Sequence, residues 1–237
     1  MGNSGLHPLL QSKKAVIFDL YHTLTATEVT SPHGLSTAAI LGIDRKLWNE
    51  HLTERSRERL TGKITDPFTI IKHAAHAINP DIPEELILQA TKHRMMRFEE
   101  SLEKMPESSI QTIRLLKKAG KKIALLSNAD IIETKGWVNC PAAVFFDVVV
   151  FSCEVGYMKP DSEIYNICLE QLKEKPEDCI FVGDGGSNEF IGAKASGIST
   201  IMVTGIVNRI WPEKLPAIEK YADFVVSEVS ALLPSNE

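Results

Sequence analysis

The sequence predicts an α/β protein, a doubly wound parallel sheet interrupted by an all-helical insert, and three observations support this fold class. From residue 107 onward, short apolar runs alternate with amphipathic helical patterns, as in proteins built from successive βα units. Residues 26–105 contain several helical patterns and almost no strand-like alternation. Polar residues follow several of the apolar runs, at the end of the sheet where open α/β proteins bind ligands.

Six short apolar runs are the predicted strands. The first is AVIFDL at residues 15–20, and the whole helical insert separates it from its partners. The chain must therefore leave the sheet after this strand and return to it later. The other five predicted strands comprise residues 121–128, 148–152, 179–184, 199–203 and 223–227.

Helices are predicted where apolar residues recur on one helix face. Within the insert, one such stripe ends at an Asn-Pro pair and comprises Ile70, Ile71, Ala74, Ala75 and Ile78. A second helix begins near Pro83, where two glutamates lie at its positive N-terminal end. After the insert, one helix ends at Gly120, and another presents an apolar face made of Ile164, Tyr165, Cys168, Leu169 and Leu172. We therefore expect a core of residues 1–25 and 106–237 and a helical cap of residues 26–105.

Composition and charge are those of an ordinary globular protein. The 237 residues are 43% hydrophobic and carry a net charge of −5, which argues against nucleic acid as the main ligand. The four cysteines are dispersed without a Cys-x-x-Cys pair, which argues against a zinc site and favours a reducing compartment. No signal-peptide core or membrane-length apolar run is present. We expect a cytoplasmic monomer or homodimer that binds a small anionic molecule, with no nucleic acid and no membrane as partner.

Polar side chains follow four of the predicted strands. In chain order these residues are Asp19, Ser127 with Asn128, Lys159, and Asp184 with Glu189. Since parallel strands end at one edge of a sheet, we expect these side chains in a single crevice. Each residue taken alone has an ordinary alternative: either aspartate as a turn residue, the Ser-Asn pair as a helix cap, and the lysine as a solvated loop residue. The set of four is the stronger signal.

These motifs resemble those of the haloacid dehalogenase (HAD) superfamily. The first motif is similar to DLYHT at residues 19–23, and the second to LLSN at residues 125–128. The third is similar to Lys159 in GYMKPD, and the fourth to GDGGSNE at residues 183–189. The resemblance covers almost the whole chain, and it implies a hydrolase with a Rossmann-like core and an inserted cap domain.

The resemblance also implies a role for each matching residue. Asp19 would be the nucleophile, while Ser127 and Lys159 would hold substrate oxygens and offset the repulsion between two anions. Mg²⁺ would be bound by Asp19, by Asp184 and by the backbone carbonyl of Tyr21, with Glu189 as a further ligand or acting through a water. The residues expected to contact substrate besides these are Thr23, Asn128, Tyr21 and Lys46.

Tyr21 occupies the position where HAD phosphatases usually carry a second aspartate, which acts as general acid and base. A phenol titrates far above neutral pH, so it serves this role poorly, and losing such a group typically costs roughly 10² to 10⁴ in rate. The first motif instead resembles the D-x-Y-G-T of the dehalogenase branch, in which halide leaves without a proton. His22 stands where that motif has glycine, and an extended backbone would point it away from Asp19. Lys46, with Arg45 beside it, best matches an arginine that lies near the halide in that branch.

The fourth motif favours the phosphatase branch. Asp184 and Glu189 beside Asp19 would repel an anionic substrate unless a cation lies among them. We therefore predict Mg²⁺-dependent hydrolysis of a small phosphorylated molecule through an aspartyl-phosphate at Asp19. Two alternatives stay open: a metal-independent 2-haloacid dehalogenase-type hydrolase, and a binding or regulatory protein that keeps the fold and turns over weakly.

Overall fold

A single parallel sheet forms the centre of the protein. The computed structural model describes residues 6–31 and 35–233, and its six strands lie in the order β3-β2-β1-β4-β5-β6. The strands are β1 (Ala15–Phe18), β2 (Lys122–Ser127), β3 (Val148–Phe151), β4 (Cys179–Gly183), β5 (Ser199–Val203) and β6 (Phe224–Val226). All six predicted strands are confirmed, and all neighbouring pairs are parallel.

The first strand of the chain lies in the middle of this sheet. Ala15 of β1 is in register with Lys122 of β2 on one side and with Cys179 of β4 on the other. All four β1 residues are buried, because helices cover both faces of the sheet. The backbone NH of Asp19 still donates to the Val182 carbonyl oxygen at 2.9 Å. The carboxylate that follows β1 is therefore placed at the centre of the C-terminal edge.

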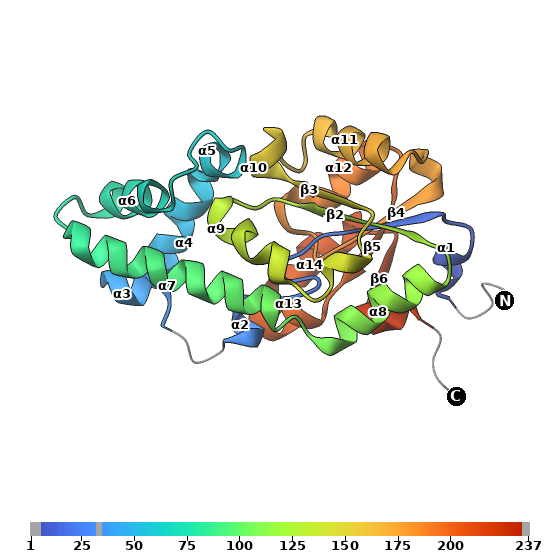
Figure 1. Ribbon diagram of the computed structural model, residues 1–237, viewed down its shortest axis with the longest axis horizontal. Helices are drawn as coiled ribbons and strands as arrows, with labels where there is room; N and C mark the ends of the chain where they lie inside the picture. Colours follow the sequence, from blue (N-terminus) through green and yellow to red (C-terminus); the bar gives the residue numbers. More distant parts are fainter. Residues whose placement is uncertain (1–5, 32–34, 234–237) are drawn as a thin grey trace.

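Helices pack on both faces of the sheet, which confirms the doubly wound core. On one face α8 (Glu107–Lys118) packs against the even-numbered residues of β1, and on the other α11 (Ser162–Leu172) and α12 (Glu189–Ala195) pack against the odd-numbered ones. Figure 1 shows α8 on one side of the strands and α11 on the opposite side. The shorter α-helices of the core are α1 (Pro8–Gln11), α9 (Ile131–Thr134), α10 (Ser152–Val155), α13 (Gly205–Ile210) and α14 (Leu215–Ile218).

The remaining helical segments of the core are 3₁₀ turns between these elements. They are η1 (Lys135–Asn139), η2 (Ala143–Phe145), η3 (Pro176–Asp178), η4 (Gly186–Asn188), η5 (Pro212–Lys214), η6 (Glu219–Tyr221) and η7 (Val229–Leu232). The predicted stop at Gly120 is confirmed, since this residue follows α8 with a φ of +83°. The alternative that Ser127 and Asn128 cap a helix is wrong, because the next helix, α9, is capped by the side chain of Asp130.

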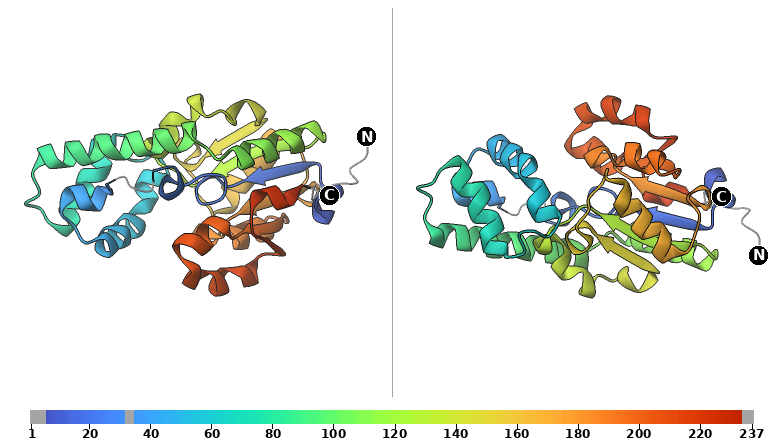
Figure 2. Two further views of the ribbon diagram at one scale, coloured as in Figure 1. Left: turned by 90° about the horizontal axis from the view of Figure 1, so that it is seen from below. Right: turned by 90° about the horizontal axis from the view of Figure 1, so that it is seen from above.

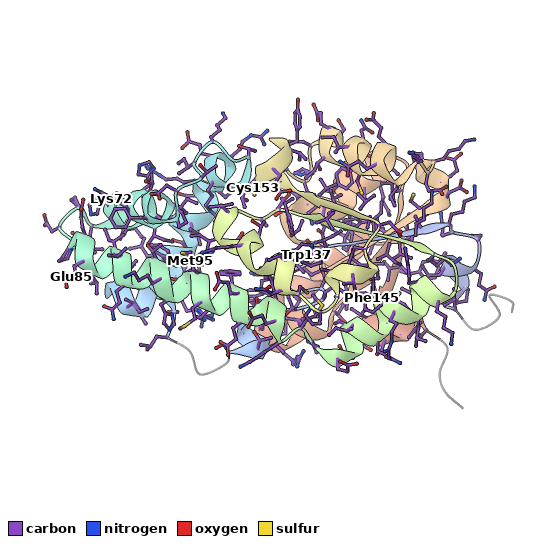
Figure 3. The ribbon with its side chains drawn as sticks, viewed as in Figure 1. Lys72, Glu85, Met95, Trp137, Phe145 and Cys153 are labelled. Carbon is purple, nitrogen blue, oxygen red and sulfur yellow. The ribbon has the colours of Figure 1, made fainter. Side chains whose placement is uncertain are left out.

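The described part of the insert between β1 and α8 is helical. Its helices are α2 (Thr27–Thr30), α3 (Thr37–Leu41), α4 (Arg45–Glu54), α5 (Ser56–Leu60), α6 (Pro67–Ile78) and α7 (Glu84–Glu103). Helices α3, α4, α6 and α7 share an apolar cluster that contains Trp48, Ile71 and Ile87, and Ile132 of α9 joins it from the core. Met95, labelled in Figure 3, packs against it from α7. Figure 2 shows α3 to α7 at one end of the molecule and the sheet at the other. We propose that residues 26–105 are a cap domain.

No helix in the described ranges is both long enough and apolar enough to cross a lipid bilayer. The longest helix, α7, runs from the cap to the core and carries charged residues along its length. Its last turn meets the core, where the Thr25 hydroxyl donates to the Ser101 carbonyl oxygen at 2.7 Å. Side chains on α7 can therefore face the carboxyl ends of the strands.

Candidate active site

Asp19, Lys159 and Glu189 form a buried cluster of charges at the C-terminal edge of the sheet. The Lys159 Nζ lies 2.6 Å from Asp19 Oδ1 and 2.6 Å from Glu189 Oε2. Thr23 donates to the other Asp19 oxygen, Oδ2, at 3.0 Å. Burial alone would lower the pKa of Lys159, but the charges of Asp19 and Glu189 outweigh burial and raise this pKa above its ordinary value. The lysine is therefore a permanent cation beside the candidate nucleophile.

Three carboxylates converge at this point. Asp19, Asp184 and Glu189 each bring one oxygen to a common site, where these atoms lie within 4.8 Å of one another. Burial raises the pKa of Asp184, and the charge of Asp19 raises it further. Burial also raises the pKa of Glu189, to about 8. Lys159 is the one ammonium or guanidinium hydrogen-bonded to these carboxylates among the residues that the structure describes.

This donor set fits a hard divalent cation. Mg²⁺ prefers carboxylate and carbonyl oxygens, and a cation among the three acids would stabilise their charged forms. Asp184 uses Oδ1 to accept from the Gly186 NH at 2.8 Å. Glu189 uses both of its oxygens, since Oε1 accepts from the Gly185 NH at 2.8 Å and Oε2 accepts from Lys159. Asp184 keeps its Oδ2 outside these hydrogen bonds and is the best candidate for direct coordination. Both oxygens of Asp19 accept hydrogen bonds, as both oxygens of Glu189 do, and Glu189 also holds the loop and the lysine.

Asn128 positions Lys159, because both polar atoms of its amide bind the backbone of that lysine. Its Oδ1 accepts from the Lys159 backbone NH at 2.7 Å, and its Nδ2 donates to the Lys159 carbonyl oxygen at 2.9 Å. Both polar atoms of the side chain are thereby engaged by one residue. Ser127, the last residue of β2, is buried and lines the cavity beside Asp19. The structure thus brings both residues to the predicted crevice, with different roles.

The Tyr21 side chain turns toward the junction of cap and core. Its hydroxyl donates to the Glu133 carbonyl oxygen at 2.6 Å, and its ring meets Phe98 of α7 edge to face at 5.1 Å. Burial raises the pKa of the phenol well above its ordinary value. The hydroxyl is therefore a fixed hydrogen-bond donor, and it does not supply the acid–base function of the aspartate usual at this position.

His22 faces the cavity, so the expectation that it points away from Asp19 is wrong. That expectation assumed an extended backbone, whereas His22 has a φ of +65°, in the left-handed region that favours glycine. Its Nε2 lies 3.5 Å from Glu28 Oε2, and its Nδ1 lies 4.0 Å from Asp184 Oδ2. The ring also packs edge to face on Trp211. The sequence carried a signal for this left-handed backbone, because the D-x-Y-G-T motif of the dehalogenase branch has glycine at the position of His22.

A cavity of about 450 Å³ extends from the carboxylates to the helices of the cap. Its core wall includes Asp19, His22, Ser127 and Lys159, and its cap wall includes residues of α4 and α7. This volume is typical of small-molecule sites. Arg45 lines the cavity, but Lys46 does not: the Lys46 side chain is 86% exposed and lies 3.9 Å from Glu50. The structure therefore does not bring the predicted Lys46 to the site.

Buried ion pairs connect the cap to the core next to the cavity. Arg59 of α5 lies 2.6 Å from Asp130, and Arg94 of α7 lies 2.7 Å from Glu133. A third pair, which is exposed, joins Arg57 to Asp161 at 2.9 Å, two residues after Lys159. Arg59 lies in a stretch rich in basic residues, yet its side chain is only 12% exposed. Charge patterns along a helix do not reveal which face another domain covers.

Four motifs meet at one edge of a parallel sheet, beneath an inserted helical segment. This arrangement is that of a hydrolase whose fold belongs to the α/β class. The chain belongs to the haloacid dehalogenase-like hydrolase family, whose model matches residues 13–197. This range contains every candidate residue of the core and of the cap. The family resemblance stated from the four motifs is thereby confirmed.

The curated proteins to which the chain is similar include a pyrophosphatase and an epoxide hydrolase. Pyrophosphatase PpaX of Bacillus cereus (strain G9842) is 32% identical over 154 residues, which are 64% of this chain and 68% of that protein. Bifunctional epoxide hydrolase 2 of Mus musculus is 34% identical over 99 residues, which are 40% of this chain. That match spans only 18% of the mouse protein. These relatives show the family and leave the substrate open.

Solved structures of both branches of the family share the fold. The L-2-haloacid dehalogenase from Xanthobacter autotrophicus, with chloropropionic acid covalently bound, matches with a TM-score of 0.62 and 20% identity over 93% of this chain and 96% of that one. A HAD phosphatase from Thermococcus onnurineus matches with a TM-score of 0.60 and 21% identity over 92% and 95% of the two chains. At such identities the likeness concerns the fold alone.

Proposed function

We propose that this HAD-family hydrolase is a Mg²⁺-dependent phosphohydrolase acting on a small phosphorylated molecule. The observation that supports this most is the group of three buried carboxylates with oxygens within 4.8 Å of one another. Burying several anions beside one lysine is costly unless a further cation compensates them. Asp19, Asp184 and the Tyr21 carbonyl would hold Mg²⁺, which supplies charge neutralisation for the phosphoryl group when bound.

The residues of the chain itself have distinct parts in this proposal. An Asp19 carboxylate oxygen attacks phosphorus, and the bond from phosphorus to the leaving group breaks with its electron pair going to that group. The oxygen of a water molecule then attacks the phosphorus of the aspartyl-phosphate, and the bond from phosphorus to the Asp19 oxygen breaks with its electron pair going to Asp19. The carboxylate is regenerated, and the protons of the water leave with the freed dihydrogen phosphate. Lys159 stays protonated throughout and offsets the negative charge of the phosphoryl oxygens, and Ser127 donates to them from the end of β2. Thr23 and Lys159 fix the two oxygens of Asp19 before attack.

Tyr21 restricts the leaving group in this proposal. Because the phenol is held by the Glu133 carbonyl and has a raised pKa, the leaving group must depart without a proton from this position. A carboxylate leaving from an acyl phosphate and a phosphate leaving from a phosphoanhydride both meet this requirement. The name of the Bacillus relative, a pyrophosphatase, supports the second type of substrate.

A second candidate is hydrolysis of a carbon–halogen bond by attack of Asp19 on carbon. The first motif favours it, since Tyr21 occupies the position of the dehalogenase tyrosine and halide leaves without a proton. Arg45 at the start of α4 lines the cavity and is a candidate for contact with a halide. The crowded acids Asp184 and Glu189 weigh against this candidate function, because beside Asp19 they would repel an anionic haloacid unless a cation lies among them.

The test is hydrolysis of four compounds by the purified protein, with Mg²⁺ and with EDTA. The compounds are acetyl phosphate, pyrophosphate, p-nitrophenyl phosphate and L-2-chloropropionate, and Asp19→Asn is the inactive control. Mg²⁺-dependent release of phosphate, fastest from the two anhydrides, is the expected result. Chloride release that is indifferent to EDTA would instead establish the dehalogenase reading.

We also propose that the protein works in the cytoplasm on small anionic molecules, without nucleic acid or membrane as partner. All four cysteines are free thiols in the structure. Burial raises the pKa of Cys153 to about 11, and burial also raises the pKa of Cys179, to about 12. Such thiols react slowly and persist in a reducing compartment. Gel filtration will distinguish between the two expected states, a monomer and a homodimer.

A further inference from the structure

Three arginines of α4 and α7 line the cavity from the cap, in addition to Arg59 of α5, which is paired with Asp130. Arg45 is the first residue of α4, and Arg94 and Arg97 lie three residues apart on one face of α7. All three line the same cavity as Asp19 and Lys159. Their guanidinium groups come from two helices that are separated in sequence, so the packing of the cap is what brings them together.

Of the arginines of α4 and α7, Arg94 alone forms an ion pair within the part of the chain that the structure describes. Arg94 binds Glu133 at 2.7 Å and stacks over the Phe98 ring, with its guanidinium carbon 4.6 Å from the ring centroid. Within residues 6–31 and 35–233, neither Arg45 nor Arg97 has a carboxylate oxygen within 4.0 Å. The Arg97 Nε is buried and has no hydrogen-bond partner in the same part of the chain. Buried donors of this kind normally have a partner.

The surroundings of Arg97 make an added anion favourable. Burial lowers the pKa of its guanidinium, and although the charge of Glu28 raises it, the neighbouring charges of Arg94 and Arg45 lower it again. Glu28 and Glu100 are the acids whose charges raise this pKa. His22 already engages Glu28 at 3.5 Å, and the Ser31 hydroxyl donates to Glu100 at 2.9 Å. The cap end of the cavity is therefore positive, and a bound anion would relieve the repulsion between the guanidinium groups.

We propose that Arg45 and Arg97 form a second anion-binding subsite, which takes an anionic group of the substrate remote from the phosphoryl group at Asp19. This inference rests on the proposed function and narrows it to phosphorylated molecules that carry a further carboxylate or phosphate. A guanidinium binds either group through two parallel hydrogen bonds. In a diphosphate or an acyl phosphate of a dicarboxylic acid, that second anion belongs to the leaving group itself.

Matched substrates test the subsite. The first pair is p-nitrophenyl phosphate and 3-carboxy-4-nitrophenyl phosphate, which differ by one carboxylate on the leaving group. Pyrophosphate, compared with acetyl phosphate, is the arm that tests a phosphate as the second anion. With Mg²⁺ present, we expect kcat/KM to favour the member with the additional anion by about 10- to 100-fold, the range of a charge-assisted contact.

Three cap variants identify the residues responsible. In Arg97→Gln the preference for the additional anion is expected to fall to about 1, and Arg97→Lys should restore part of it because the charge returns. Arg55→Gln is the matched control, since Arg55 is an exposed arginine at the end of α4 that does not line this cavity. It should keep the preference of the native protein. Far-UV circular dichroism and urea unfolding confirm that each variant is folded.

Binding to Asp19→Asn separates failure of the subsite from failure of the proposed function. If the native protein hydrolyses none of the phosphates, but calorimetry shows tighter binding of the carboxylated compound that Arg97→Gln abolishes, the subsite stands and the phosphohydrolase proposal falls. If both members of each pair are hydrolysed or bound equally well, the subsite is overturned while the phosphohydrolase proposal is judged by turnover alone. A preference that survives in Arg97→Gln and in Arg45→Gln also overturns it.

Discussion

Gly62 of the cap lies against Cys153 of the core, at a distance that no other residue type would permit. A Cβ placed on Gly62 would be 2.1 Å from the Cys153 carbonyl oxygen. Gly62 follows α5 with a φ of +71°, and Figure 3 labels Cys153 where the core meets this helix. The contact is next to the Arg57 and Arg59 ion pairs, so it fixes how deeply the cap sits on the core.

Gly62→Ala is expected to lower the free energy of unfolding by more than Gly42→Ala does. Both glycines have positive φ, +71° and +66°, so both variants bear a backbone cost of roughly 1 to 2 kcal/mol. A Cβ on Gly42 meets no atom within 4 Å, whereas one on Gly62 collides with the core backbone. Urea unfolding of the two variants measures the difference. If both variants lose the same free energy of unfolding, the cap and core can move apart at Gly62 without a loss of stability.

Asn128→Ala is expected to lower kcat/KM for the preferred substrate by about 5- to 150-fold. The substitution removes two hydrogen bonds to the Lys159 backbone, each contributing roughly 0.5 to 1.5 kcal/mol to the placement of the lysine. Asn166→Ala on the exposed face of α11 is the control and should leave kcat/KM unchanged. Native activity in Asn128→Ala would mean that the pair does not position Lys159.

Lys159→Gln is expected to destabilise the protein by roughly 3 to 5 kcal/mol in EDTA, because it leaves three buried carboxylates without their cation. Excess Mg²⁺ should reduce this loss, since binding to the folded state is stabilising. The control is Lys121→Gln, another buried lysine, which donates to the backbone carbonyl of Leu10. Its loss should not depend on Mg²⁺. Urea unfolding with and without Mg²⁺ measures both, and identical Mg²⁺ effects would contradict the metal site.

Glu28→Gln is expected to destabilise the protein at pH 5 to 6 and to have little effect near pH 2. Burial by itself raises the pKa of Glu28, but the hydrogen bond and charge of His22 outweigh it and lower the pKa to about 2, from an ordinary 4.5. A depressed carboxylate pKa contributes stability that is present above pH 4.5 and is lost as pH falls toward 2. The expected size is roughly 1 to 3 kcal/mol.

Urea unfolding across this pH range tests the Glu28 prediction. Glu103→Gln, an exposed position on α7, serves as the control and should show no such dependence on pH. A loss in Glu28→Gln that stays constant from pH 6 to pH 2 would show that the pair with His22 contributes nothing through charge.

The strands and the core residues of the site could be predicted because they depend on local pattern and on topology. AVIF is apolar throughout and is buried between β2 and β4, as a central strand requires. Asp19 and Asp184 each follow a strand and Ser127 ends one, so a parallel sheet places them at one edge without further information. The position of Lys159 does not follow from the sheet alone, because the residue lies in a loop after β3. Two hydrogen bonds from Asn128 to the Lys159 backbone fix this loop.

The cap wall of the site could not be predicted, because it depends on how one domain packs on another. The sequence singled out Lys46, yet its neighbour Arg45 is the residue that lines the cavity, a rotation of about 100° around the helix. In the sequence, nothing distinguishes Arg59 and Arg94 from other charged helix residues. Only the structure shows that they lie opposite Asp130 and Glu133 of the core. His22 was misjudged because a single left-handed residue reverses the direction of its side chain.

The central position of β1 has a consequence for how the chain is made. Residue 15 pairs with residues 122 and 179, so the strand that leads to Asp19 is synthesised long before either neighbour exists. Contacts so distant in sequence slow folding, and an unpaired apolar strand is a site of aggregation until they form. On the ribosome, the helices of the insert can begin to fold while the AVIF segment is still unpaired. The strand that leads to Asp19 is therefore synthesised before both of its neighbours, and its pairing is complete only after residue 179 has emerged.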